Sequence, residues 1–179
     1  MSEIPPLFHS LEHDGPFRRC LTCGKDFREI DEPYNITKVF RGTECVFEYA
    51  ICQSCRLEQL ESFSEESRQT MEDFFEENEH LQSREERLEG NENYEDRIKE
   101  CATCGTSLDE LKEYSLGCVA FDDHMVVGHF PMMICAKCES ELQSRLSKST
   151  RDQWDRFISE NFDGPPADAL KPDGVPMLV

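Results

Sequence analysis

Alternation of apolar and polar side chains predicts a β-hairpin in the first third of the chain. Residues 34–40 and 45–51 alternate in this way, and the Arg-Gly-Thr-Glu run at 41–44 between them suits a turn. Residues 56–61, shortly after the second strand, have a helical composition. The pattern therefore predicts two paired strands that lead into a helix.

The same succession returns in the second half of the chain. Strands are predicted at 113–121 and 125–134, with Asp-Asp-His at 122–124 as the turn. A helix is expected at 138–146, and the Ser-Thr-Arg-Asp run at 149–152 resembles a capping box that begins another helix. The predicted order is again hairpin, helix and further helix.

Apolar side chains recur at helical spacing beyond each of the first helices. The positions are Met71, Phe74 and Phe75 in the first half and Trp154, Phe157 and Ile158 in the second. Ser64 is suited to cap the earlier of these two further helices. We expect both apolar stripes to be core, packed against a hairpin or against the other half, with a groove for a partner as the alternative.

The two halves are copies of one unit. Residues 51–55 and 134–138 both read Ile-Cys-x-x-Cys at an offset of 83, and Cys-x-Thr-Cys-Gly stands at 20–24 and 101–105 at an offset of 81. The second copy has therefore gained two residues in its middle, where a hairpin turn can absorb them. A fixed period of this kind is a strong architectural signal.

Eight of the ten cysteines belong to four Cys-x-x-Cys pairs, which form two sets. The first set is Cys20, Cys23, Cys52 and Cys55, and the second is Cys101, Cys104, Cys135 and Cys138. A pair of thiolates, a spacer and a second pair supply the four ligands of a tetrahedral zinc site. We therefore predict two zinc ions per chain, with iron as the alternative because four-thiolate sites also hold that metal.

The order of first cysteine pair, hairpin, second cysteine pair and helix resembles the treble-clef zinc fingers. The resemblance covers residues 20–79 and 101–162 and implies an α+β fold of small zinc-stapled domains, two tandem treble-clef-like units each followed by a further helix. A zinc ribbon is the nearest alternative, but there both cysteine pairs lie in hairpins. A cross-braced site with interleaved ligands is disfavoured because each repeat already holds four ligands in sequence. Treble-clef proteins have many functions, so the resemblance does not define one.

Three segments lie outside the repeats. We expect residues 1–19 to be a leader that is loose or that packs late. Residues 80–100 are expected to be a charged helical extension followed by a solvated linker, and residues 163–179 a Pro-rich tail that is extended or disordered. The first ten residues lack the pattern of a signal peptide. This favours a cytoplasmic protein with reduced thiols, hence zinc rather than disulfides.

Acidic residues dominate the chain, with 38 Asp and Glu against 19 Lys and Arg and a formal net charge of −19. Sixteen acidic and six basic residues lie in residues 56–100. Because Lys and Arg supply most of the affinity for phosphate backbones, we expect no direct binding to nucleic acid. The same charge disfavours anionic membranes.

Two cysteines and five histidines fall outside the repeated sets. Cys45 and Cys118 match under neither offset, so we expect buried strand residues rather than ligands. No histidine recurs between the repeats; His124 and His129 flank the second turn, near enough to approach the second site, but exposed loop histidines are the simpler interpretation.

Two sites closed by four thiolates indicate structural rather than catalytic metal, because catalytic zinc keeps an open position. The sequence also lacks the hydrolase and phosphate-loop motifs. We therefore expect a non-catalytic zinc-binding protein that acts as an adaptor or regulator by binding another protein. The alternatives are an acidic regulator that mimics nucleic acid to block a basic partner, and an accessory subunit of an enzyme complex.

Overall fold

One antiparallel sheet of six strands runs through both repeats. The computed structural model describes residues 2–162, and its strands follow the order β1-β5-β4-β2-β3, with β6 paired to β4 beside β5. The elements are β1 (Ser2–Glu3), η1 (Pro6–Phe8), η2 (Phe27–Glu29), β2 (Tyr34–Arg41), β3 (Glu44–Cys52), α1 (Gln53–Ser62), α2 (Glu65–Glu76), α3 (Glu79–Arg87), α4 (Tyr94–Ile98), η3 (Leu108–Glu110), β4 (Glu113–Phe121), β5 (His124–Met125), β6 (Met132–Cys135), α5 (Ala136–Arg145) and α6 (Lys148–Asn161), where η denotes a 3-10 helix. The α+β class is confirmed.

The first hairpin is confirmed, whereas the second departs from the prediction. Strands β2 and β3 pair along their whole length, with a bulge after Val39. The continuous strand expected at 125–134 is instead two short strands, β5 and β6, which pair with different parts of β4. Pro131 lies just before β6 and cannot donate a ladder hydrogen bond, which explains why the second strand breaks there.

The helices α2 and α6 each begin at a serine that caps them. Ser64 caps α2 as expected, because its hydroxyl accepts from the Ser67 N–H at 3.2 Å. In the second repeat the capping box expected at 149–152 is wrong by two residues. The cap is Ser147, which accepts from the Thr150 N–H at 3.2 Å, so α6 begins at Lys148.

The two repeats are related by an approximate twofold axis that passes through the sheet. Strand β2 pairs antiparallel with β4, and Thr37 faces Gly117 in this register. The repeated tyrosines Tyr34 and Tyr114 align the two strands at an offset of 80, under which Thr37 is itself equivalent to Gly117. The register is therefore symmetric about this one pair, as in a homodimer whose two copies share a sheet.

The same symmetry governs the starts of α2 and α6, where four hydroxyl residues meet. We call this contact the seam; its members are Ser64, Ser67, Ser147 and Thr150. The Ser64 N–H donates to the Thr150 hydroxyl at 3.1 Å, and the equivalent Ser147 N–H donates to the Ser67 hydroxyl at 2.9 Å. These reciprocal bonds tie the second helix of each repeat to the other repeat.

Buried side chains from both repeats form one hydrophobic core. The sequence had left open whether the repeats share a core. The leader also contributes and is packed, which is the second of the two expected alternatives: β1 pairs with β5, and Phe8 is fully buried. Buried Lys38 adds to this docking, because its ammonium group contacts Glu48 at 3.0 Å and donates to the His9 carbonyl. The leader is held because it covers apolar surface that the sheet would otherwise expose.

Residues 80–100 begin with the expected helix, α3, but the part expected to be a solvated linker contains a second helix, α4, and is not simply solvated. Arg84 on α3 is completely buried and donates to the carbonyls of Arg97 and Pro131. Arg97 on α4 is nearly buried and donates to the carbonyls of Leu88 and Gly128. Composition suggested solvent exposure because it counts charges, whereas these two guanidinium groups fasten α3, α4 and the β5–β6 loop together through backbone carbonyls.

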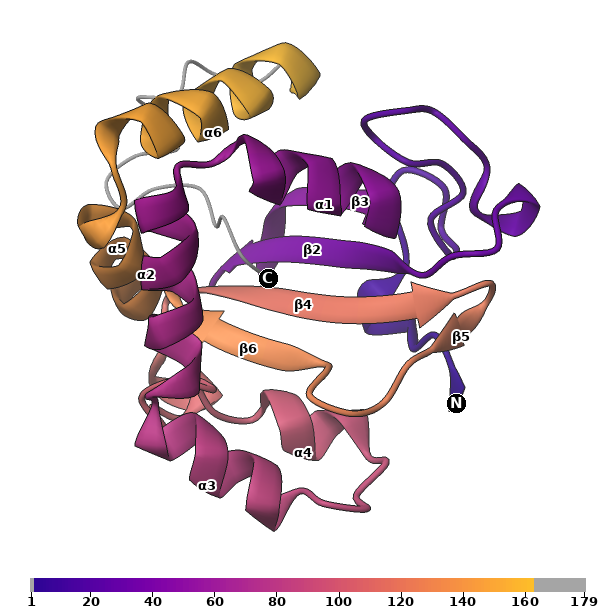
Figure 1. Cartoon of the computed structure of the whole chain (residues 1–179). Helices are drawn as coiled ribbons and strands as arrows, with labels where there is room; N and C mark the ends of the chain where they lie inside the picture. The colour runs from indigo at the N-terminus through magenta and orange to yellow at the C-terminus, as the bar shows by residue number, and fades with distance from the viewer. Residues whose placement is uncertain (1, 163–179) are drawn as a thin grey trace.

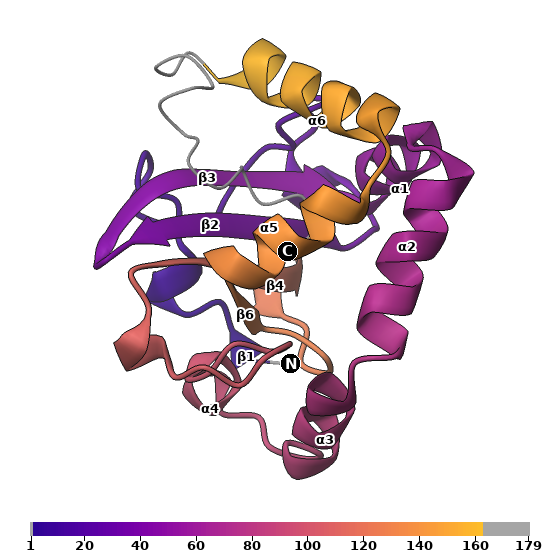
Figure 2. The same ribbon diagram turned by 90° about the vertical axis from the view of Figure 1, so that its left-hand side faces the viewer.

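The helices surround the sheet at several places. Figures 1 and 2 show α3 and α4 at one end, α6 at the opposite end, and α2 running between these ends. Across residues 2–162, no helix is long and apolar enough to cross a membrane. The tail expected at 163–179 lies outside the described residues.

Candidate metal centres

The structure brings the eight repeated cysteines into the two groups of four that the sequence pattern indicates. Within each group, all four Sγ atoms lie within 4.8 Å of one another. A Zn–S bond of about 2.3 Å places the sulfurs of a regular tetrahedron about 3.8 Å apart. The Sγ atoms of Cys23 and Cys52 are 3.9 Å apart, and those of Cys104 and Cys135 are 3.8 Å apart. Each group can therefore hold one metal ion.

The first cysteine pair of each group lies on a tight turn. Gly24 donates its N–H to the Cys20 carbonyl at 2.9 Å, and Gly105 does the same to Cys101 at 2.8 Å. Both glycines have positive φ, 71° and 73°, which a residue with a side chain adopts only with strain. The repeated Cys-x-Thr-Cys-Gly run thus defines a turn that aims two sulfurs in one direction.

The second pair of each group lies where a strand passes into a helix. Cys52 ends β3 and caps α1, with Cys55 in the first turn; Cys135 and Cys138 occupy the same places at β6 and α5. The free N–H groups and the dipole at a helix N-terminus stabilise thiolate charge. The backbone N–H of Cys52 also points to Cys20 Sγ at 3.4 Å. The Cys135 N–H makes the equivalent contact with Cys101 at 3.3 Å.

Burial and hydrogen bonds between the thiols raise the pKa of some of the cysteines and lower that of others. Hydrogen bonds from the Cys135 and Cys138 thiols lower the pKa of Cys101, and the same contact with Cys101 raises the pKa of Cys138. In the first group, burial raises the pKa of Cys52 to about 11. Four thiols this close cannot all ionise without a cation between them, so metal binding and proton release are linked.

Exposure within each group is uneven and follows the repeat. Cys23 and Cys104, the second cysteine of each turn, are exposed, whereas the other six are buried. Each centre therefore lies under the surface with one sulfur open to water. Thr103 and Thr106 surround the second centre, their hydroxyls at 3.4 Å from Cys101 Sγ and 3.2 Å from Cys104 Sγ. Thr103 belongs to the repeated Cys-x-Thr-Cys-Gly run, which was the available signal for this contact.

The remaining cysteines and the two histidines near the second turn stand apart from both groups. Cys118 is buried in β4, and burial raises the pKa of its thiol to about 12. Cys45 lies in β3 as expected but is only half-buried, and it donates to the Phe47 carbonyl at 3.4 Å. His129 pairs with Glu85 at 3.2 Å, and His124 is exposed on β5. In the described part of the chain, the two metal-binding groups consist of cysteines alone.

His80 is a contact that the sequence gave no reason to expect. It does not recur in the second repeat, yet its imidazole ring covers the turn at Gly105 so closely that a Cβ there would lie 2.6 Å from Cε1. The ring also lies 3.5 Å from the Glu100 carboxylate. Glycine at position 105 is favoured by its positive φ, and a side chain there would also displace this ring.

Comparison with known proteins adds no relative: no family model, curated protein or solved structure matches the chain. The class of protein is therefore defined by its own fold and cysteine groups. It is an α+β protein with a duplicated unit and two four-cysteine groups, each able to hold a metal ion.

Proposed function

We propose that the protein binds two zinc ions in structural sites and acts by binding another protein. The observation that carries this proposal is the pair of four-sulfur groups at tetrahedral spacing, each formed by a turn and by the place where a strand passes into a helix. Four thiolates complete the coordination of zinc and leave no position for water or substrate. Such sites stabilise a fold, which supports a non-catalytic role.

The units are treble-clef-like in this proposal. Each has a cysteine turn with a glycine of positive φ, then strands, then a second cysteine pair at the start of a helix. The second pair begins α1 and α5 rather than a hairpin turn, which favours this arrangement over a zinc ribbon. Zinc is favoured over iron because reduced thiols in the cytoplasm, the proposed compartment, commonly bind zinc as a structural ion.

An adaptor or regulator needs a surface that is set in place by its metal sites. A protein of 179 residues built from two small units has little core of its own for each unit, so the metal supplies rigidity that a binding surface requires. The acidic surface, at net −19 before the thiolates are counted, directs such a protein toward basic rather than acidic partners.

The test is purification of the tagged, full-length chain from its native source after reversible cross-linking, at about 0.15 M and about 0.5 M salt. The proposal predicts a stoichiometric protein partner that is absent when the same experiment uses Cys52→Ser. Recovery without any partner, or measurable turnover that follows the purified chain, would contradict it.

A second candidate is an acidic regulator that occupies the nucleic-acid site of a basic protein, favoured by the net charge alone. It predicts a partner that itself binds DNA or RNA and is released by the higher salt. A partner retained at high salt favours the adaptor.

A further inference from the structure

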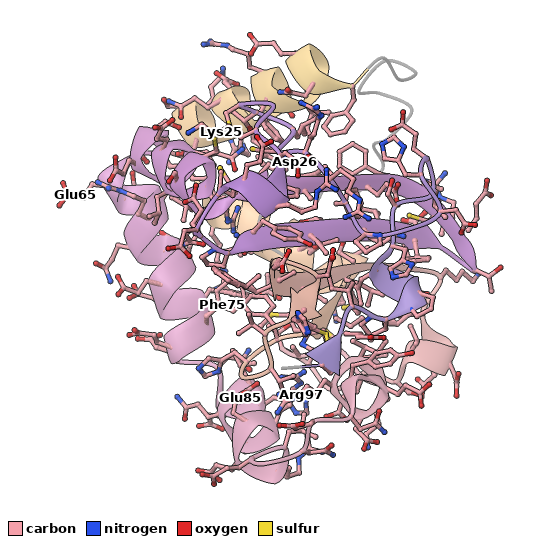
Figure 3. The ribbon with its side chains drawn as sticks, turned by 90° about the vertical axis from the view of Figure 1, so that its right-hand side faces the viewer. Lys25, Asp26, Glu65, Phe75, Glu85 and Arg97 are labelled. Atoms are coloured by element: carbon pink, nitrogen blue, oxygen red, sulfur yellow. The ribbon has the colours of Figure 1, made fainter. Side chains whose placement is uncertain are left out.

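An open apolar cleft lies between α2, α3 and the loop that joins β5 to β6. Its volume is about 770 Å³. Its walls are Phe75, Leu81, Phe130 and Met132, with Glu76, Gln82, Glu85 and His129 at the rim. Figure 3 shows two of these side chains, with Phe75 on α2 and Glu85 toward α3 on the same side of the molecule. We refer to this space as the α2–α3 cleft.

The internal repeat supplies a comparison for this cleft. At the offset of 83, Phe130 and Met132 are equivalent to Phe47 and Tyr49. In that copy the surface is covered, because the Phe162 ring lies 4.2 Å from Phe47 and the Phe157 ring lies 5.9 Å from Tyr49. Two equivalent contacts therefore exist: α6 of the second repeat lies on Phe47 and Tyr49, and α2 of the first repeat lies beside Phe130 and Met132.

Only one of the two contacts is completed by an aromatic side chain. Phe162 covers Phe47, but the equivalent position in the first repeat is Glu79. The consequence is visible in the helix itself: Ile158 on α6 is buried, whereas its equivalent Phe75 on α2 is partly exposed. The α2–α3 cleft therefore corresponds to the place that Phe162 fills in the other repeat.

The surroundings of the cleft are acidic. Residues 69–79 contain five acidic residues and neither Lys nor Arg, and Glu76 lies at the rim itself. Two cations engage rim residue Glu85: buried Arg84, which also donates to the carbonyls of Arg97 and Pro131, and His129 at the rim itself. Arg87 pairs with Glu100 at 2.5 Å, so among the described residues Glu76 and the other acidic residues of this stretch have no cation at the cleft. A cationic segment is thus the complementary occupant.

We propose that the α2–α3 cleft binds a positively charged segment of another protein that inserts an aromatic side chain against Phe75 and Phe130. The aromatic group would lie against Phe130 as Phe162 lies against Phe47. Basic residues around it would face the acidic residues of the 69–79 stretch. At such surfaces a buried aromatic side chain usually supplies most of the affinity, and charged residues at the rim steer the partner into place. This inference rests on the proposed function and specifies its partner.

The test uses a fluorescein-labelled, lysine-rich amphipathic peptide with one phenylalanine, and a matched peptide with alanine in its place. Anisotropy titrations at about 0.15 M salt compare the metal-loaded protein with Phe130→Ala, which removes the wall of the cleft, and Glu76→Lys, which reverses charge at its rim. Glu58→Lys on α1 is the control, because it makes the same charge change at an exposed site on another helix. Metal content and melting temperature establish that each variant is folded.

The proposal predicts that the phenylalanine peptide binds the unmodified protein at least tenfold more tightly than the alanine peptide. Phe130→Ala and Glu76→Lys should each weaken binding about tenfold or more, with Glu58→Lys within twofold of the unmodified protein. Equal binding of both peptides, or binding that Glu76→Lys and Phe130→Ala leave unchanged, overturns it. If Phe130→Ala and Glu76→Lys recover as much of the native partner as the unmodified protein does, the cleft inference fails while the proposed binding function stands.

Discussion

The seam between α2 and α6 gives a sharp prediction for the change Thr150→Val. Valine has almost the same shape as threonine, so the change removes a hydroxyl without opening a cavity. The Thr150 hydroxyl accepts from the Ser64 N–H at 3.1 Å and from the Ser147 hydroxyl at 3.1 Å, and it donates to the Ser64 hydroxyl at 3.4 Å. The residue is completely buried. The change therefore leaves partners in both repeats unsatisfied.

The magnitude follows from these bonds. A neutral hydrogen bond contributes about 1 kcal/mol net, and a buried donor left without an acceptor costs about 1–3 kcal/mol. The two stronger bonds together give an expected loss of about 2–3 kcal/mol in the free energy of unfolding. The measurement is urea unfolding of the zinc-saturated protein, followed by the fluorescence of the buried Trp154.

Thr70→Val is the matched control. The Thr70 hydroxyl donates only to the Glu66 carbonyl of its own helix, at 2.8 Å, so this change should cost less than about 0.5 kcal/mol. Ser67→Ala tests the symmetry, since Ser67 accepts the equivalent bond from the Ser147 N–H. If Thr150→Val and Thr70→Val have the same effect within about 0.5 kcal/mol, the seam does not couple the repeats and our interpretation of the twofold contact is wrong.

Three further predictions concern the metal ligands, the pH dependence of metal binding and the buried cation Arg84. Cys52→Ser and Cys135→Ser should each release one metal ion per chain, measured by elemental analysis, whereas Cys45→Ser should release none, because Cys45 lies outside both groups; metal loss from Cys45→Ser would show that the first ligand set is misassigned. Acidification from pH 7 to pH 5 should weaken metal binding, since the ligands are thiolates and protons compete for them, and a zinc indicator dye that reports equal affinity at both pH values would contradict four-thiolate ligation. Arg84→Met should destabilise the protein by about 2–4 kcal/mol in thermal or urea unfolding, because the carbonyls of Arg97 and Pro131 lose their donor. Exposed Arg87→Met is the control and should have a mild effect. Equal effects of the two changes would show that the buried guanidinium group does not hold these segments together.

Local structure could be predicted from the sequence because it depends on residues that are close together in the chain. Alternation over 34–40 and 45–51 was enough for the first hairpin, and Ser64 was enough for the start of α2. The four-cysteine groups could be predicted from spacing and repetition, and the structure brings the sulfurs together through a turn and the start of a helix. The prediction of the second hairpin was wrong because the alternation of apolar and polar residues did not take account of Pro131, which lies just before β6 and cannot donate a ladder hydrogen bond.

Long-range features were beyond the pattern. The pairing of β2 with β4 joins residues about eighty positions apart, and no local signal distinguishes it from two separate sheets. The charged composition of residues 80–100 predicted a helical extension and a solvated linker, because charged residues are usually exposed. Arg84 and Arg97 are instead buried, with backbone carbonyl groups as acceptors inside the protein. The docking of Phe8 likewise depends on surface that exists only once the sheet has formed.

The central claim is that each chain holds two zinc ions in two separate four-thiolate sites. Native mass spectrometry of the purified chain, with inductively coupled plasma analysis of the same sample, measures the number and identity of the ions together. We predict two zinc ions per chain, falling to one in either Cys52→Ser or Cys135→Ser. A single ion per chain, or iron in stoichiometric amount with the absorbance of a cluster, would contradict the account.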